Sequence, residues 1–172
     1  MKRRWGQVIS GIQSWLSTLS GPEVLVSFFT YDTTAHNVIV YRTPEELSNL
    51  INQGLEVSSG AYVSLPIVFE TTEDIIGGKN VPVQIDSEWL HYEVLMTVSD
   101  FEYPTEALHE FALFKKDRGI NYFLNAITQL GRNDEMTKVV TSLEGVHYSI
   151  KRGANFTTAF TEALERDPFK GN

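Results

Sequence analysis

The chain has 172 residues, 22 acidic and 14 basic, which gives a formal net charge of −8, and it contains no cysteine. Its length and its 42% hydrophobic content suit a single domain over residues 1–172 with a sizeable core. The lack of cysteine excludes disulfides, zinc–thiolate sites and cysteine nucleophiles, and the scattered basic residues predict neither a nucleic-acid nor a membrane surface.

The chain opens with a predicted helix and a predicted hairpin. Apolar residues recur at helical spacing from Trp5 to Leu19, so we expect an amphipathic helix there. Residues 24–29 form an apolar run typical of a strand, and residues 36–41 can return antiparallel to it after a polar turn.

Two further helices are predicted before the middle of the chain. Thr43 and Glu46 have the spacing of a capping box, and Pro44 stands at the first helical position. We expect this helix to end near Gly54. Residues 63–75 predict the next helix.

In the second half, strands alternate with helices. This order predicts parallel strand pairing with right-handed crossovers, and therefore a mostly parallel, Rossmann-like α/β sheet flanked by helices. Gly119 stands where a glycine is expected to end a helix. The predicted strands are residues 92–98, 120–127 and 146–150, and the predicted helices are residues 105–118, a short helix capped by Asn133, and residues 156–165.

Several short segments, taken together in their order and spacing, indicate a known protein family, although none of them is diagnostic alone. They are Phe28-Phe-Thr-Tyr-Asp32, Thr43-Pro-Glu-Glu-Leu47, Ser58-Ser-Gly60, Met96-Thr-Val-Ser-Asp100, Phe114-Lys-Lys-Asp-Arg-Gly-Ile120, Gly131-Arg-Asn-Asp-Glu-Met136 and Gly145-Val-His-Tyr148. With these segments the chain resembles a von Willebrand factor A domain from Trp5 to Leu164. The resemblance implies that family's α/β fold.

The resemblance also implies where a functional site would lie. The family builds a metal-ion-dependent adhesion site from three loops, using the carboxylates and hydroxyls that a hard cation prefers. The first loop, Asp-x-Ser-x-Ser, is absent from this sequence, and Ala61 stands where the second loop would supply a threonine hydroxyl. Asp100 alone matches the third loop, and Phe101 follows it in place of glycine. We therefore expect a degenerate site that holds no metal ion and no cofactor.

The family's first strand is absent from the sequence as well. In the family it lies between the strands that correspond here to residues 24–29 and 92–98. The two flanking strands could pair directly, another chain could donate a strand, or the chain could lack a segment of the complete protein. The second hypothesis implies a homo-oligomer or a strand-donating partner. Residues 81–85 are poorly suited to take the place of this strand, because Pro82 has no backbone N–H to donate to the ladder of a central strand.

The remaining polar residues form no catalytic pattern. The four histidines are dispersed, and no Gly-x-Ser-x-Gly motif occurs. Glu70, Glu73 and Asp74 are best explained as a solvated helix face. We therefore expect no enzyme. The alternatives are a metal-dependent adhesion domain truncated before its first loop, and a small Rossmann-like enzyme.

We predict a non-enzymatic, protein-binding domain of adhesion or scaffold type. No apolar run reaches the length of a membrane span and no signal peptide is evident, so we expect a soluble, cytoplasmic protein.

Loops at the carboxyl ends of parallel strands form a ligand-facing rim. The two aromatic residues of residues 101–103 could either bind a partner there or merely cover the helix that starts at Thr105. The predicted partner-binding residues are Asp32, Ser59, Tyr62, Asp100, Phe101, Glu102 and Tyr103.

Overall fold

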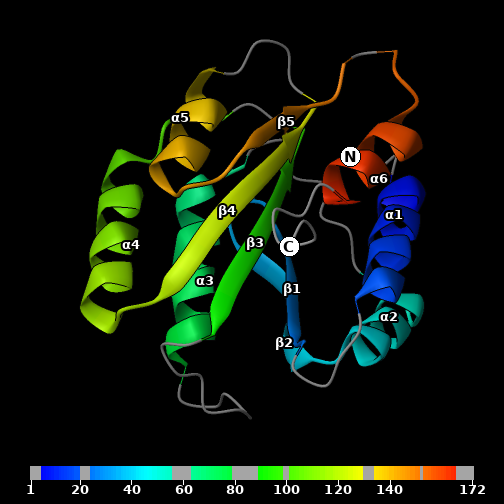
Figure 1. Cartoon of the computed structure of the whole chain (residues 1–172), viewed down its shortest axis with the longest axis horizontal. Helices are drawn as coiled ribbons and strands as arrows, with labels where there is room; N and C mark the ends of the chain where they lie inside the picture. The colour runs from blue at the N-terminus through cyan, green and yellow to red at the C-terminus, as the bar shows by residue number, and fades with distance from the viewer. Residues whose placement is uncertain are drawn as a thin grey trace.

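A sheet in two parts lies between two layers of helices (Figure 1). The computed structural model describes residues 5–19, 24–55, 63–78, 89–98, 101–129, 134–151 and 153–165. The helices in these ranges are α1 (Trp5–Thr18), α2 (Pro44–Asn52), α3 (Leu65–Gly77), α4 (Thr105–Arg118), α5 (Asp134–Ser142) and α6 (Phe156–Glu165). The strands are β1 (Val26–Tyr31), β2 (Ala35–Arg42), β3 (Leu90–Thr97), β4 (Asn121–Thr128) and β5 (His147–Ser149).

The predicted order of helices and strands is confirmed, and the α/β fold class with it. Element ends differ from the predictions by about two residues, as sequence-based boundaries commonly do. The third helix begins at Leu65 and not at residue 63, because a proline, here Pro66, is tolerated only in the first turn. Asn133, the predicted cap of α5, lies outside the described residues.

Two local signals fix helix ends as the sequence predicted. The Oγ1 atom of Thr43 accepts a hydrogen bond from the backbone nitrogen of Glu46 at 3.2 Å. In return, the Glu46 carboxylate accepts one from the backbone nitrogen of Thr43 at 3.1 Å, which completes the capping box. At the end of α4, Gly119 adopts the left-handed conformation with φ of 61°, where the lack of a Cβ avoids strain.

The parallel part of the sheet has the order β3-β4-β5. Strands β3 and β4 pair in register along their whole length, from Leu90 opposite Asn121 to Thr97 opposite Thr128. Seven consecutive residues of β4 are buried, because helices cover both faces of this strand. This burial is typical of a central parallel strand and explains its continuous apolar sequence.

The other part of the sheet is the antiparallel hairpin β1-β2. Its register shifts between Val26 and Phe28 and again between Phe28 and Thr30. On the facing strand, Asn37 and Tyr41 have positive φ angles of 51° and 45°. Such irregularities increase the local twist of a hairpin.

In the described part of the chain, helices rather than a shared backbone ladder hold the hairpin to the rest of the fold. Leu16 of α1 packs with Leu47 and Ile51 of α2 in a buried cluster. Val26 and Phe28 of β1 lie against this cluster. The hairpin is thus attached through side-chain packing.

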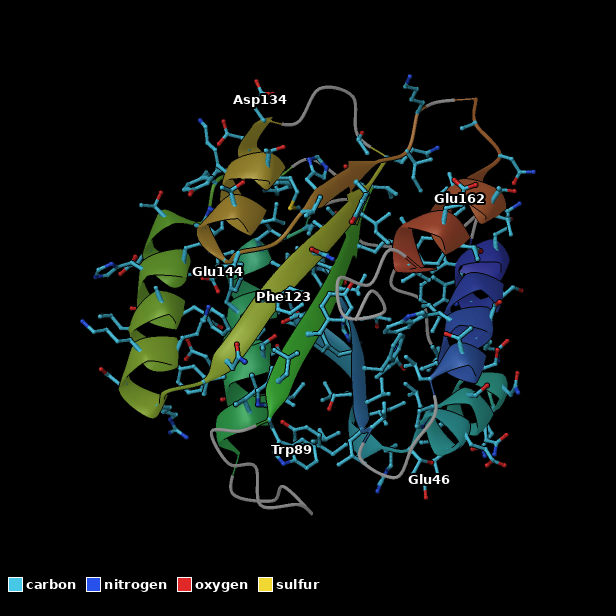
Figure 2. The ribbon with its side chains drawn as sticks, in the orientation of Figure 1. Glu46, Trp89, Phe123, Asp134, Glu144 and Glu162 are labelled. Carbon is cyan, nitrogen blue, oxygen red and sulfur yellow. The ribbon has the colours of Figure 1, made fainter. Side chains whose placement is uncertain are left out.

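The main core lies between the parallel strands and the helices α3, α4 and α5, where side chains fill the space (Figure 2). Phe69, Phe111 and Leu124 at its centre are at most 1% exposed. On the other face of the sheet, Val8 of α1 and Phe160 of α6 belong to a second buried cluster. Both faces of the sheet are therefore apolar.

Gly145, in the turn between α5 and β5, provides a test of this packing. A Cβ atom at this position would lie 1.4 Å from the carbonyl oxygen of Leu124, which is backbone and cannot rotate away. We expect Gly145→Ala to lower the free energy of unfolding by roughly 1–3 kcal/mol or more, measured by urea denaturation.

Gly6 in α1 is the matched control, because a Cβ there meets nothing within 4 Å. Gly6→Ala should leave the stability unchanged or raise it by up to about 1 kcal/mol, because alanine favours a helix. Equal stability of the two variants would contradict the close approach of Gly145 to β4.

Candidate interaction site

The carboxyl ends of β1 and β3 meet at one end of the sheet. The hydroxyl of Tyr31, the last residue of β1, donates to the main-chain oxygen of Met96 in β3 at 3.2 Å. The same hydroxyl also interacts with the side chain of Thr97. The turn that follows β1 and residues 101–104 after β3 are therefore the described parts of the predicted rim.

Asp32 lies in the turn after β1, where its carboxylate organises the turn. Its Oδ1 atom accepts a hydrogen bond from the backbone nitrogen of Thr34 at 2.9 Å and lies 3.1 Å from Nε2 of His36. Its main-chain oxygen accepts a hydrogen bond from the nitrogen of Ser64, just before α3, at 2.9 Å. Asp32 therefore fixes the rim, and a partner would meet a carboxylate that is already engaged within the turn.

Residues 101–103 comprise one side chain that packs against the core and two that are exposed. Phe101 is partly buried and packs against the main core. Glu102 is exposed, and Tyr103 is 36% exposed. The main-chain oxygens of Tyr103 and Pro104 accept hydrogen bonds from the start of α4, both at 2.9 Å. The segment is thus anchored at Phe101 and presents its next two side chains to solvent.

The other predicted rim residues, Ser59, Tyr62 and Asp100, lie outside the described residues. Their place in the rim stays a prediction. Within the described ranges, no group of three or more His, Asp or Glu side chains could hold a metal ion.

The hypothesis that the flanking strands pair directly is wrong. In the described residues, β1 pairs with β2, β3 pairs with β4, and no ladder joins β1 to β3. A cavity of about 600 Å³ lies between them instead, lined by residues 24–32 and 89–98. We call this cavity the slot.

Sequence reasoning missed a polar cluster beside the slot. The Glu93 carboxylate, on β3, accepts hydrogen bonds from the hydroxyl of Tyr122 at 2.6 Å and from Oγ1 of Thr72 at 2.9 Å. Tyr122 and Thr72 are only 2% and 6% exposed. Burial raises the pKa of the Glu93 carboxyl above its usual value, and the two hydrogen bonds partly oppose this rise. A glutamate inside an apolar strand was the signal in the sequence.

The cluster also affects Tyr122. Burial, together with the negative charge of Glu93, raises the pKa of the Tyr122 hydroxyl far above its usual value. The hydroxyl therefore stays protonated and remains a donor to the carboxylate. Glu93 and Tyr122 come from adjacent strands, and Thr72 comes from α3. The cluster thus ties the sheet to this helix.

Solved structures with the same fold were found, although no protein-family model and no curated protein matches the chain. An aerotolerance-related membrane protein from Bacteroides fragilis, in a variant with multiple mutations to serine, matches with a TM-score of 0.61 and 6% identity, over 95% of this chain and 89% of that one. Within the described residues of the present chain, no helix is long and apolar enough to cross a membrane.

Proximal thread matrix protein 1 from the mussel byssus also matches, in two structures. The TM-scores are 0.66 and 0.64 at 12% identity, over 96% and 95% of this chain. The chain spans 42% of that protein's length. At such identities the likeness shows the fold alone. The fold is α/β of von Willebrand factor A type.

The raised pKa of Glu93 predicts a pH dependence of stability. As the pH rises above about 4.5, the unfolded chain releases the Glu93 proton before the folded chain does. The free energy of unfolding therefore falls as the pH rises from about 4.5 to the higher pKa that Glu93 has in the folded protein. Glu93→Gln keeps a carbonyl acceptor but cannot ionise, so relative to the unmodified protein it should gain stability as the pH rises through this window. Urea denaturation of both proteins at several pH values measures the difference, and a constant difference would contradict the assignment.

Proposed function

We propose that the chain is a non-enzymatic, protein-binding domain of adhesion or scaffold type. The observation that carries the proposal is the anchored segment of the rim, where Phe101 packs in the core while Glu102 and Tyr103 are exposed. A tyrosine on a held backbone loses little conformational freedom on binding, and tyrosine is enriched at protein interfaces. The von Willebrand factor A-like fold of the structural neighbours supports this reading.

The proposed mode of recognition is shape and polar complementarity without a cation. The first-loop ligands are absent from the sequence, and Ala61 replaces a hydroxyl. A single remaining carboxylate at Asp100 would leave magnesium mostly hydrated and weakly held. We therefore propose that the adhesion site is degenerate and metal-free.

The rim can be tested with a photo-crosslinking amino acid at position 103 of the whole chain. We expect it to capture a partner that the same amino acid at position 113 does not. Leu113 is the matched control because it is 46% exposed on α4, away from the rim. With the captured partner purified, Tyr103→Ala should weaken binding by roughly tenfold or more, and Leu113→Ala should not. Identical captures at the two positions, or equal affinities of the two variants, would contradict the proposal.

The absence of a cation can be tested separately. Titration of magnesium chloride into the protein should give no saturable heat in calorimetry, and binding of the captured partner should be unchanged by EDTA. Saturable binding, or loss of the partner in EDTA, would support a metal-dependent adhesion domain instead.

A further inference from the structure

Strand β5 lies beside β4 and is attached to it by a short ladder (Figure 1). It has three residues, and its pairing with β4 runs from His147 opposite Ala126 to Ser149 opposite Thr128. The pairing of β3 with β4, in comparison, extends over the eight residues of each strand. A segment with few ladder hydrogen bonds opens easily, so the attachment of β5 depends on side-chain contacts as well.

The ring of His147 supplies such contacts to two other elements. Its Nε2 atom lies 2.6 Å from Oγ1 of Thr128, the last residue of β4. Its Nδ1 atom lies 2.9 Å from Oγ1 of Thr137 on α5. Both ring nitrogens are therefore within hydrogen-bond distance of a threonine hydroxyl. We call these three side chains the His147 bridge.

The two hydroxyls differ in exposure, and this difference sets the direction of the hydrogen bonds. Thr128 is 0% exposed, whereas Thr137 is exposed. Within the described residues, the Thr128 hydroxyl has no acceptor other than Nε2 of His147. A buried hydroxyl proton without an acceptor is costly, so Thr128 donates to Nε2. Nε2 then carries no proton, and Nδ1–H donates to Thr137.

This arrangement requires a neutral imidazole. A charged ring carries a proton on both nitrogens, so its Nε2–H would point at the Thr128 hydroxyl. That hydroxyl would have to accept, and its own proton would be left buried without an acceptor in the described structure. The Thr137 hydroxyl accepts from Nδ1 in both states. Protonation therefore disrupts the bridge on the side of β4.

Burial acts in the same direction as this geometry. It lowers the pKa of His147 below the usual value of about 6.5. Strand β4 carries no charged residue, and its Tyr122 lies at the other end of the strand from Thr128. The other charged or titratable residues on α5, on β5 and in the turns beside β5 are Asp134, Glu135, Lys138, Glu144, Tyr148 and Lys151. The effect of burial on His147 persists in the presence of these groups.

The lowered pKa sets the sign of the pH dependence. When β5 opens, the ring of His147 enters water and regains its usual pKa of about 6.5. As the pH falls below this value, the opened form takes up a proton before the closed form does, so opening becomes more favourable. Above about 6.5 both forms are neutral, and the bridge contributes its full stabilisation.

We propose that the His147 bridge is an acid-sensitive switch, which holds β5 against β4 and α5 at neutral pH and releases β5 at mildly acidic pH. The main core does not need the bridge, because β4 stays paired with β3 and covered by helices. Thr128 lies opposite Thr97 of β3, so the release acts at the end of the sheet where the rim lies. The switch does not depend on the rim binding a partner.

The ring of His147 can be observed by NMR in the unmodified whole chain, labelled with nitrogen-15. Long-range nitrogen–proton spectra distinguish the two tautomers, and we expect Nδ1–H at about pH 7.5. We also expect a titration midpoint below about 6.5. An Nε2–H tautomer, or a midpoint at or above about 6.5, would overturn the proposal. This measurement does not require any variant to fold.

Hydrogen exchange measures the release itself. The backbone N–H of Ile150 donates to the main-chain oxygen of Thr128 at 2.7 Å, so its exchange reports on the attachment of this segment to β4. After correction for the intrinsic pH dependence of exchange, we expect its opening equilibrium constant to rise about threefold or more from about pH 7.5 to about pH 5. Amides of β3 should change less, because the long ladder with β4 does not include the bridge. An unchanged constant at Ile150, or an equal rise in β3, would contradict the release of β5.

His147→Gln separates the bridge from the other titrating groups. The amide of glutamine offers an acceptor to Thr128 and a donor to Thr137, but it does not ionise, so the rise at Ile150 should disappear. His109→Gln is the matched control and should keep the full rise, because His109 is exposed on α4 and takes no part in the bridge. A rise that survives in His147→Gln would assign the pH response to other groups and sink the switch.

Discussion

The break between β1 and β3 is the constraint on which the rest of this structure depends. Sheets are normally held together by continuous backbone ladders, but here two ladders end on either side of an apolar slot. The parts are held in place by helices, because α1 packs on α6 while α2 packs on the hairpin. The position of β1 relative to β3 therefore depends on side-chain packing, together with the contacts of the Tyr31 hydroxyl with the main-chain oxygen of Met96 and with the side chain of Thr97.

Polar groups lie where this apolar slot meets the main core. Glu93 is held by Tyr122 and Thr72, so its carboxyl has two donors although apolar residues surround it. A buried carboxyl with fewer partners would be costly, because desolvation penalises its charge. The cluster joins β3, β4 and α3, and it keeps the edge strand β3 in place beside an open cavity.

The rim and the slot differ in chemistry and in position. The rim lies at the carboxyl ends of the strands, is polar, and presents Glu102 and Tyr103. The slot lies within the sheet and presents backbone edges between apolar walls. The same fold occurs in a bacterial membrane protein and in a mussel byssus protein, so the fold by itself does not decide what is bound.

The sequence by itself determined the order and type of the elements, because these depend on local signals. The capping box at Thr43, the glycine at position 119 and the apolar periodicity each act within a few residues. The family resemblance also predicted that residues 1–172 do not contain the strand that lies between the counterparts of β1 and β3. The tertiary structure decided how the fold accommodates that gap, which backbone edges remain open, and that Glu93 meets Tyr122 and Thr72. The contacts of Glu93 join residues 21 and 29 positions apart in the chain, and the contact of Tyr31 with Met96 joins residues 65 positions apart, so no local pattern specifies them.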